Sequence, residues 1–295
     1  MVIENTDNLD KGKMYEGFVK SCGDCSDCGD CDSCGGDCEL HDNCNRESRL
    51  RCVVMVAGVK GGIGKTTVCG IIANNLARRG LDVGILDANL SASAVCTIYD
   101  RTEKPTIREA GIVPLISENG VKMMSLPCFL SNEAIPMTFD ANDAKDFALQ
   151  FYSDVVWGAL DVLLIDCPSD TADVMQEMIN IKELDGVVLV TDAGELSKKM
   201  AQKTINFAWI NKLNVVGLVE NYANFYDDKT IIDELCAGYS ISARDSLDFD
   251  ISIRQLADKG EFGKYDKDVL NEVTDKLVYI AEHHNDKLYE SESAE

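Results

Sequence analysis

Long apolar runs and basic residues are both scarce in this 295-residue chain, and each scarcity excludes a class of protein. No apolar run approaches the roughly 18 residues that a membrane-spanning helix requires. Lys and Arg number 28 against 51 Asp and Glu, which gives a formal net charge of −23. A surface with this charge repels phosphate backbones and anionic lipids. We therefore expect no nucleic-acid partner and no membrane partner.

A secretory signal is also missing from the first twenty residues, which are acidic and polar where a signal peptide is basic and then apolar. Cysteine, in contrast, is abundant, since the chain has 13 cysteines and seven of them lie between Cys22 and Cys44. In a chain of this size without a signal, such cysteines favour reduced thiols that hold a metal over disulfides. The sequence therefore predicts a soluble cytoplasmic protein with a metal-binding segment.

Hydrophobic periodicity is nearly absent before residue 51, and afterwards apolar runs alternate with helical stretches. Continuous apolar strands of this kind predict an α/β fold with a mostly parallel, doubly wound sheet covered by helices on both faces. The predicted strands are 52–57, 83–86, 121–126, 160–165, 186–190 and 215–219, and helices are expected at 251–257 and 269–281. We divide the chain into a cysteine-rich acidic arm (1–50), an α/β nucleotide-binding domain (51–284) and an acidic tail (285–295).

A glycine-rich turn between the first predicted strand and the next helix has the composition of a phosphate-binding loop. It reads Val59-Lys60-Gly61-Gly62-Ile63-Gly64-Lys65-Thr66-Thr67. Its small residues let backbone N–H groups surround the phosphates of ATP, Lys65 can reach the β and γ phosphates, and the Thr66 hydroxyl can bind Mg2+. A chance glycine turn with two lysines is the alternative interpretation, and the strand–turn–helix context argues against it.

A second magnesium ligand is expected at the end of a later strand. Asp166 follows the apolar run 162–165, so it lies at the carboxyl edge of the predicted sheet. This is a Walker B arrangement, in which the aspartate holds Mg2+ directly or through water.

The phosphate loop departs from the general Walker A pattern in an informative way. Val59 stands where the first glycine is expected, and a second lysine, Lys60, precedes Gly61 and Gly62. This arrangement resembles the deviant Walker A motif of the MinD, nitrogenase iron protein and Mrp/ApbC superfamily of ATPases. In that superfamily the extra lysine reaches across a dimer interface to the partner's nucleotide. The resemblance implies a homodimer with ATP between its subunits and catalytic roles for Lys60, Lys65 and Asp166.

Within that superfamily the chain is most similar to the Mrp/ApbC-type iron-sulfur cluster carriers. The segment from Asp166 to Asp173 resembles their Asp-Leu-Pro-Pro-Gly-Thr-Gly-Asp signature and agrees at four positions, 166, 168, 171 and 173. Residues 217–221 and 247–260 are similar to two further family segments. The resemblance implies a carrier that transfers a 4Fe-4S cluster to apoprotein clients, with Asn221 facing the adenine.

Two departures from the family pattern matter for function. Asn89 stands where the family has a second aspartate that positions the attacking water, and an amide does not usefully accept a proton at neutral pH. Nucleotide binding is therefore expected, while hydrolysis is left open. The family also carries a Cys-x-x-Cys pair after the residue matching Asn221, and residues 222–229 contain no cysteine. The bridging cluster of the family has no ligands at that position.

The seven cysteines of the arm are the remaining candidates for a cluster. They are Cys22, Cys25, Cys28, Cys31, Cys34, Cys38 and Cys44. Within them, Cys28-x2-Cys31-x2-Cys34-x3-Cys38 has the spacing of the ferredoxin run, although Glu39 stands where ferredoxins have proline. A 4Fe-4S cluster on a subset of these thiols is the preferred interpretation. Zn2+, Cu+ or no metal remain open, because soft thiolates suit iron, zinc and copper alike.

Three other functions remain as alternatives. A nucleotide-gated metallochaperone or enzyme maturation factor would carry another metal on the arm. A MinD-like positioning ATPase would need a basic amphipathic terminal helix, and the last predicted helix is followed by acidic residues. A reductase like the nitrogenase iron protein would need paired cysteines in the α/β domain, where the cysteines are isolated.

Overall fold

The computed structural model describes residues 47–89, 93–101, 103–129, 148–149, 151–168, 178–179, 181, 183–225 and 230–283. Its main strands are β2 (Val53–Gly58), β3 (Val83–Asp87), β6 (Leu115–Ile116), β7 (Lys122–Met124), β9 (Val162–Asp166), β10 (Leu184–Thr191), β11 (Val215–Asn221) and β12 (Ala243–Leu247). In the described part of the chain they form one sheet in the order β12-β11-β10-β2-β9-β3-β7-β6. Only the pair β6–β7 is antiparallel. The predicted α/β fold with a mostly parallel sheet is therefore confirmed.

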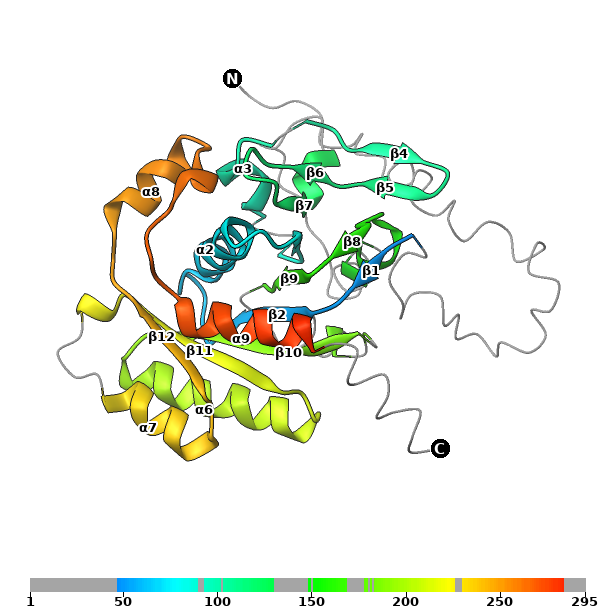
Figure 1. Cartoon of the computed structure of the whole chain (residues 1–295). Coiled ribbons are helices and arrows are strands. Elements are labelled where there is room, and N and C mark those ends of the chain that lie inside the picture. The colour runs from blue at the N-terminus through cyan, green and yellow to red at the C-terminus, as the bar shows by residue number, and fades with distance from the viewer. Residues whose placement is uncertain are drawn as a thin grey trace, which may run out of the picture. The chain divides into compact units, whose positions relative to one another are not determined.

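Helices cover both faces of this sheet, as Figure 1 shows. Helices α2 (Lys65–Arg78) and α9 (Asn271–Glu282) lie together on one face, where α2 contacts β2, β3 and β9 and α9 contacts β11 and β12. Helices α6 (Glu195–Ile210) and α7 (Thr230–Tyr239) pack on the other face, below β10 in Figure 1. Every residue of β2, β3 and β9 is buried, because apolar strands between two helical layers have no solvent-exposed side.

Two predicted elements have different bounds from those expected. The strand predicted at 121–126 is limited to β7, because the chain enters a 3-10 helix, η4 (Leu126–Phe129), where Pro127 cannot donate a backbone hydrogen bond to a strand. The helix predicted at 269–281 begins at Asn271, because Leu270 has a left-handed backbone with φ of 57°.

The strand predicted at 160–165 is divided into two pieces that serve different sheets. Its first part, β8 (Ala159–Leu160), pairs in parallel with β1 (Arg49–Leu50), and β9 joins the main sheet. Asp161 lies between them, and its N–H donates to the Asp82 carbonyl at 2.8 Å. Arg49 and Leu50, which precede strand β2, are therefore part of the α/β fold.

The remaining elements are short and lie mostly at the rim of the sheet. They are α3 (Val95–Ile98), β4 (Thr106–Arg108), β5 (Gly111–Val113), η5 (Ala223–Phe225), α8 (Ile251–Asp258) and η6 (Phe262–Lys264). Strands β4 and β5 form an antiparallel hairpin. In the described residues, no helix is both long and apolar enough to cross a lipid bilayer.

Candidate nucleotide site

The phosphate loop connects the end of β2 to the first residue of α2 and depends on two glycines with positive φ. Gly62 has a φ of 72° and Gly64 a φ of 89°. A Cβ atom on Gly64 would lie 2.3 Å from Asn221 Nδ2, so a side chain here would displace the Asn221 amide. The loop thereby brings its backbone to the N-terminal end of α2, where N–H groups and the helix dipole favour a phosphate.

Two buried carboxylates and one hydroxyl converge beside this loop. Asp166 ends β9 and pairs in register with Asp87, which ends the neighbouring strand β3. The Thr66 hydroxyl donates to Asp166 Oδ2 at 2.5 Å. Among the described residues, the other carboxylate oxygen of Asp166, Oδ1, is buried and has no hydrogen-bond partner.

The burial of these carboxylates makes their ionisation costly. Burial, reinforced by the charge of Asp87, raises the pKa of Asp166 to about 8. Burial also raises the pKa of Asp87 to about 6, although hydrogen bonds from Ser125 and from three backbone N–H groups oppose this. A divalent cation would stabilise both carboxylates in their charged form. The Thr66 hydroxyl and the unpartnered Oδ1 of Asp166 therefore fit Mg2+, and their role as its ligands stays a prediction.

Asp87 organises the segments around Asn89, which stands where the family has its water-positioning aspartate. Its Oδ1 accepts from Asn89 N at 3.1 Å, and its Oδ2 accepts from Ala94 N at 3.1 Å, Val95 N at 3.3 Å and Ser125 Oγ at 3.0 Å. One carboxylate thus ties the segment of Asn89 to the start of α3 and to the end of β7. Asp87 belongs to no predicted site motif, and its only signal in the sequence is its place at the carboxyl end of a buried strand.

The additional lysine of the loop forms an ion pair within its own chain. Lys60 Nζ lies 2.5 Å from Oδ2 of Asp192, the residue that follows β10, and the side chains are 37% and 5% exposed. Asp192 also accepts a hydrogen bond from the backbone N–H of Gly194 at 3.0 Å. This pair is not predictable from the sequence, because a lone aspartate after a strand has no motif to distinguish it.

Asn221 lies at the end of β11 and is buried against the phosphate loop. Its Nδ2 donates to the Ile63 carbonyl at 2.8 Å, and its Oδ1 accepts from Tyr222 N at 3.0 Å. Tyr222 has a left-handed backbone with φ of 59°, which this hydrogen bond supports. Asn221 therefore holds the loop to the sheet, and its predicted contact with adenine stays a prediction.

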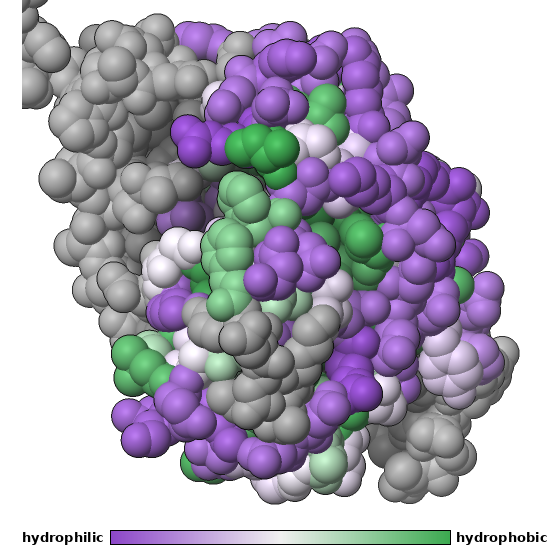
Figure 2. Space-filling view, turned by 90° about the vertical axis from the view of Figure 1, so that its left-hand side faces the viewer, coloured by the Kyte–Doolittle hydropathy of each residue, from purple (hydrophilic) through white to green (hydrophobic). Residues whose placement is uncertain are grey.

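Aromatic side chains follow Asn221, in a segment that contains no cysteine. The rings of Tyr222 and Phe225 stack with centroids 6.0 Å apart, and Phe225 stacks on Phe249 at 5.4 Å. Phe225 is 65% and Phe249 44% exposed. Figure 2 faces the side on which η5 and α8 lie in Figure 1, and shows hydrophobic surface within a largely hydrophilic face.

The cysteines of the described residues are poor candidates for cluster ligands. All six are buried: Cys52, Cys69, Cys96, Cys128, Cys167 and Cys236. Burial raises the pKa of the Cys69 and Cys167 thiols, which disfavours the thiolate that binds a metal. In the part of the chain that the structure describes, no group of three or more His, Cys, Asp or Glu side chains could hold a metal ion.

Several predicted residues lie outside the described residues. They are the arm cysteines Cys22, Cys25, Cys28, Cys31, Cys34, Cys38 and Cys44, and the signature positions Thr171 and Asp173. The structure brings together the loop residues Lys60–Thr67, Asp166 and Asn221 at one edge of the sheet.

Most of the chain is similar in sequence to known proteins. The family model described as NUBPL iron-transfer P-loop NTPase matches residues 49–282. The iron-sulfur cluster carrier protein of Methanocaldococcus jannaschii is 31% identical over 237 residues, which cover 76% of this chain and 80% of the relative. The cytosolic Fe-S cluster assembly factor NUBP1 homolog of Brugia malayi is 28% identical over 265 residues, covering 83% and 85%.

Solved structures agree with the fold. A nucleotide-binding protein from Archaeoglobus fulgidus in complex with ADP has 28% sequence identity and a TM-score of 0.63, with 74% of this chain and 90% of that chain covered. The cell division ATPase MinD of Pyrococcus furiosus has 19% identity and a TM-score of 0.57, covering 80% and 99%, and at that identity it shows the fold alone.

Proposed function

The chain belongs to the NUBPL iron-transfer P-loop NTPase family, and on this premise we propose that it is an ATP-binding carrier that passes an iron-sulfur cluster to apoprotein clients. The observation that carries the nucleotide half of this proposal is the convergence of the phosphate loop, Thr66 and Asp166 at one edge of the sheet. The cargo half is supported by the family and by the cysteine-rich arm.

The phosphate loop and Lys65 bind the triphosphate. Gly62 and Gly64 let the backbone approach the phosphates, and Lys65 at the start of α2 neutralises the β and γ phosphates. Thr66 and Asp166 would hold Mg2+, which would supply positive charge to neutralise the phosphates. Asp166 supplies its unpartnered Oδ1 for this role, with Asp87 beside it.

The segments that are hydrogen-bonded to Asp87, those of Asn89 and the start of α3, respond to which nucleotide is bound. Asn89 and the start of α3 both donate backbone N–H groups to this carboxylate. A γ phosphate or a cation beside Asp87 changes the charge that these groups face, so it shifts the segment of Asn89. Asn89 lacks a carboxylate that could take a proton from water, so hydrolysis is slow and binding itself is the main signal.

Two copies of the chain enclose ATP. Lys60 leaves Asp192 and reaches the nucleotide of the partner. Its ammonium group supplies the positive charge that the partner's site needs. The exposed aromatics Phe225 and Phe249 lie next to Tyr222, whose hydroxyl is 3.5 Å from the position of a Cβ on Gly64. Apolar surface at this edge supports association in a protein whose net charge of −23 otherwise opposes it.

The cluster is held by a subset of the arm cysteines. The buried thiols of the α/β domain are poor ligands, and aromatic residues stand at the bridging position of the family. The run from Cys28 to Cys38 has suitable spacing for a 4Fe-4S cluster.

A transfer assay tests this function. The anaerobically reconstituted full chain is mixed with an apo-ferredoxin, and cluster transfer is followed by circular dichroism with ATP, with ADP and without nucleotide. We expect transfer whose rate differs between ATP and ADP, and loss of that difference in Lys65→Ala. Transfer that is indifferent to nucleotide would contradict the proposal, and a chain that takes up zinc but no sulfide would favour a metallochaperone.

A further inference from the structure

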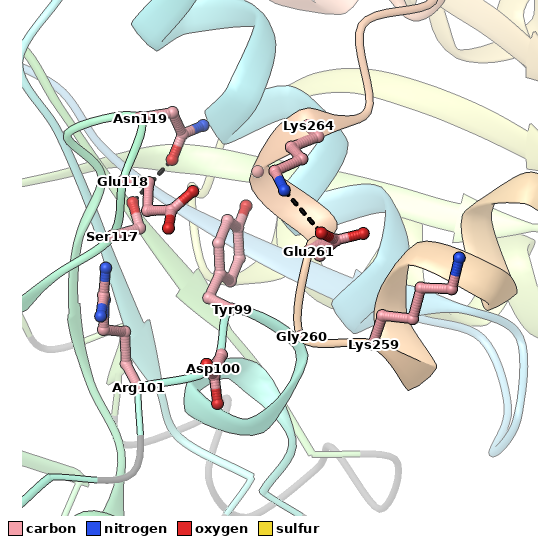
Figure 3. A pocket seen from close by; sticks show the side chains of 11 residues that line it. Tyr99, Asp100, Arg101, Ser117, Glu118, Asn119, Lys259, Gly260, Glu261 and Lys264 are labelled. Carbon is pink, nitrogen blue, oxygen red and sulfur yellow. Dashed lines mark hydrogen bonds and ion pairs between the residues drawn. The ribbon is translucent and has the colours of Figure 1, made fainter.

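A cavity with a volume of about 310 Å3 lies apart from the nucleotide site and has no phosphate-loop residue in its lining. Three segments form it: the end of α3 at Tyr99–Arg101, the turn between β6 and β7 at Ser117–Asn119, and the segment from Lys259 to Lys264 that leads from α8 into η6. Figure 3 shows these segments on three sides of Tyr99. The cavity is therefore built from residues that are distant in sequence.

The floor of this cavity is a closed hydrogen-bond network. Asn74 Oδ1 accepts from the Tyr99 hydroxyl and from Asn119 Nδ2, both at 2.8 Å. Ser117 donates to Asn119 Oδ1 at 2.6 Å. These groups satisfy one another and fix the shape of the floor, so they do not require a ligand.

Arg101 is different, because its guanidinium has no hydrogen-bond or ion-pair partner among the described residues. Its Nε is buried, and Figure 3 shows the guanidinium pointing toward the turn that carries Ser117. The backbone of Arg101 is well anchored: its N–H donates to the Cys96 carbonyl at 2.8 Å, and its carbonyl accepts from Cys128 Sγ at 3.8 Å. A permanently charged group held with a buried, unsatisfied donor is costly unless an acceptor joins it.

The other charges around the cavity decide what kind of acceptor fits. The lining has three basic side chains, Arg101, Lys259 and Lys264, and three acidic ones, Asp100, Glu118 and Glu261. Lys264 and Glu261 pair at 2.5 Å and neutralise each other. Asp100 and Glu118 are exposed at the rim, where they repel an incoming polyanion. The balance favours a small ligand with one oxyanion group over a triphosphate or an acidic polymer.

We propose that this cavity binds a small molecule through a single carboxylate or phosphate group, which accepts hydrogen bonds from the guanidinium of Arg101. Arginine presents two parallel donors that match the two oxygens of such a group. Lys259 lies on the other side of the opening and supplies the second positive charge. The site is separate from the phosphate loop and does not depend on the carrier function proposed above.

The Nε–H resonance of Arg101 reports on this site directly. The 15N-labelled full chain is titrated with sodium acetate, with sodium phosphate and with sodium chloride at equal ionic strength. We expect the Arg101 signal to shift and saturate with acetate or phosphate, and the anion that saturates at the lower concentration identifies the preferred group. Arg108, exposed in β4, serves as the internal control and should not move. A shift that never saturates, or that chloride reproduces, overturns the proposal.

Substitution provides a second measurement. Arg101→Lys keeps the charge but loses the paired donors, so the affinity for the saturating anion should fall about tenfold. The anchoring bonds of Arg101 use only backbone atoms, so the variant keeps them. Arg108→Lys is the matched control and should bind as the unmodified chain does. Unchanged affinity in a folded Arg101→Lys protein contradicts the proposal, and if that variant does not fold, the titration of the unmodified chain decides alone.

Discussion

Lys60 and Asp192 form an ion pair inside one chain, with Nζ 2.5 Å from Oδ2. In the deviant Walker A superfamily, the equivalent lysine serves the nucleotide of the partner subunit. In the dimer that we propose, Lys60 contacts the partner's nucleotide, so formation of this dimer would break the pair with Asp192. The pair therefore favours the single chain over the dimer.

Replacing Asp192 with asparagine should strengthen ATP-linked dimerisation. An ion pair of this exposure is worth about 1 kcal/mol, so its loss in both subunits should tighten the dimer by roughly thirtyfold. Asparagine keeps an oxygen that can accept from Gly194. Sedimentation velocity with ATP and Mg2+ measures the effect. Glu234→Gln, which removes the ion pair of Lys198 at the same 2.5 Å distance, is the control and should leave dimerisation unchanged. A weaker Asp192→Asn dimer would mean that this carboxylate itself contacts the partner.

Removing the lysine of the pair should have the opposite effect. Lys60→Ala should leave ATP binding to the single chain within about twofold, because Lys65 provides the charge beside the phosphates. It should weaken dimerisation by about tenfold or more, as expected when a charge-assisted contact is lost. Titration calorimetry gives the first quantity and sedimentation the second. Lys65→Ala should lose nucleotide affinity itself, and equal losses in both variants would remove the distinction between the two lysines.

The two positive-φ glycines of the phosphate loop allow a matched comparison. An alanine at either position must adopt a left-handed backbone, which costs about 1–2 kcal/mol. A Cβ on Gly64 also meets Asn221 Nδ2 at 2.3 Å, whereas one on Gly62 has no heavy atom within 4 Å. Gly64→Ala should therefore lower both the free energy of unfolding and ATP affinity more than Gly62→Ala, measured by urea denaturation and calorimetry. Equal effects would show that the Asn221 side chain moves away from the new methyl group at little cost in free energy.

The sheet could be predicted because its central strands are continuous apolar runs between helical stretches. Strand β12 was not predicted, since its sequence Ala-Arg-Asp-Ser-Leu buries only its two ends at the edge of the sheet. Likewise, β8 and β9 appeared as one run, because only the three-dimensional pairing with β1 separates them. The amino-acid pattern of a strand does not indicate which other strand it pairs with.

The local part of the site was also accessible from sequence. The phosphate loop and Asp166 belong to short motifs whose chemistry follows from neighbouring residues. Asp192 and Arg101 could not be identified from sequence, because the Lys60 pair and the cavity lining join segments far apart in the chain. Asp87 had a weaker signal, its place at the end of a buried strand. It is recognised as a site residue only because the structure places it in register with Asp166.

Restoring a carboxylate at position 89 should raise ATP hydrolysis. Asn89 donates its backbone N–H to Asp87, so its segment already lies beside the paired carboxylates of the site. A residue that accepts a proton from water contributes about 10²-fold or more, so Asn89→Asp should hydrolyse ATP about 10² times faster. Phosphate release measures the rate, and Asn89→Ala controls for loss of the amide. If Asn89→Asp is no faster, a group other than residue 89 limits hydrolysis.

The central claim is that the arm carries an iron-sulfur cluster for a nucleotide-dependent transfer. It is tested most directly by iron, acid-labile sulfide and zinc analysis of anaerobically purified full-length protein. The comparison is a chain with serine at Cys22, Cys25, Cys28, Cys31, Cys34, Cys38 and Cys44, which leaves the strand pair of Arg49–Leu50 intact. The account predicts about four iron and four sulfide per chain, as in a 4Fe-4S cluster, and neither in the serine variant. Zinc without sulfide, or a cluster that survives the seven substitutions, would contradict it.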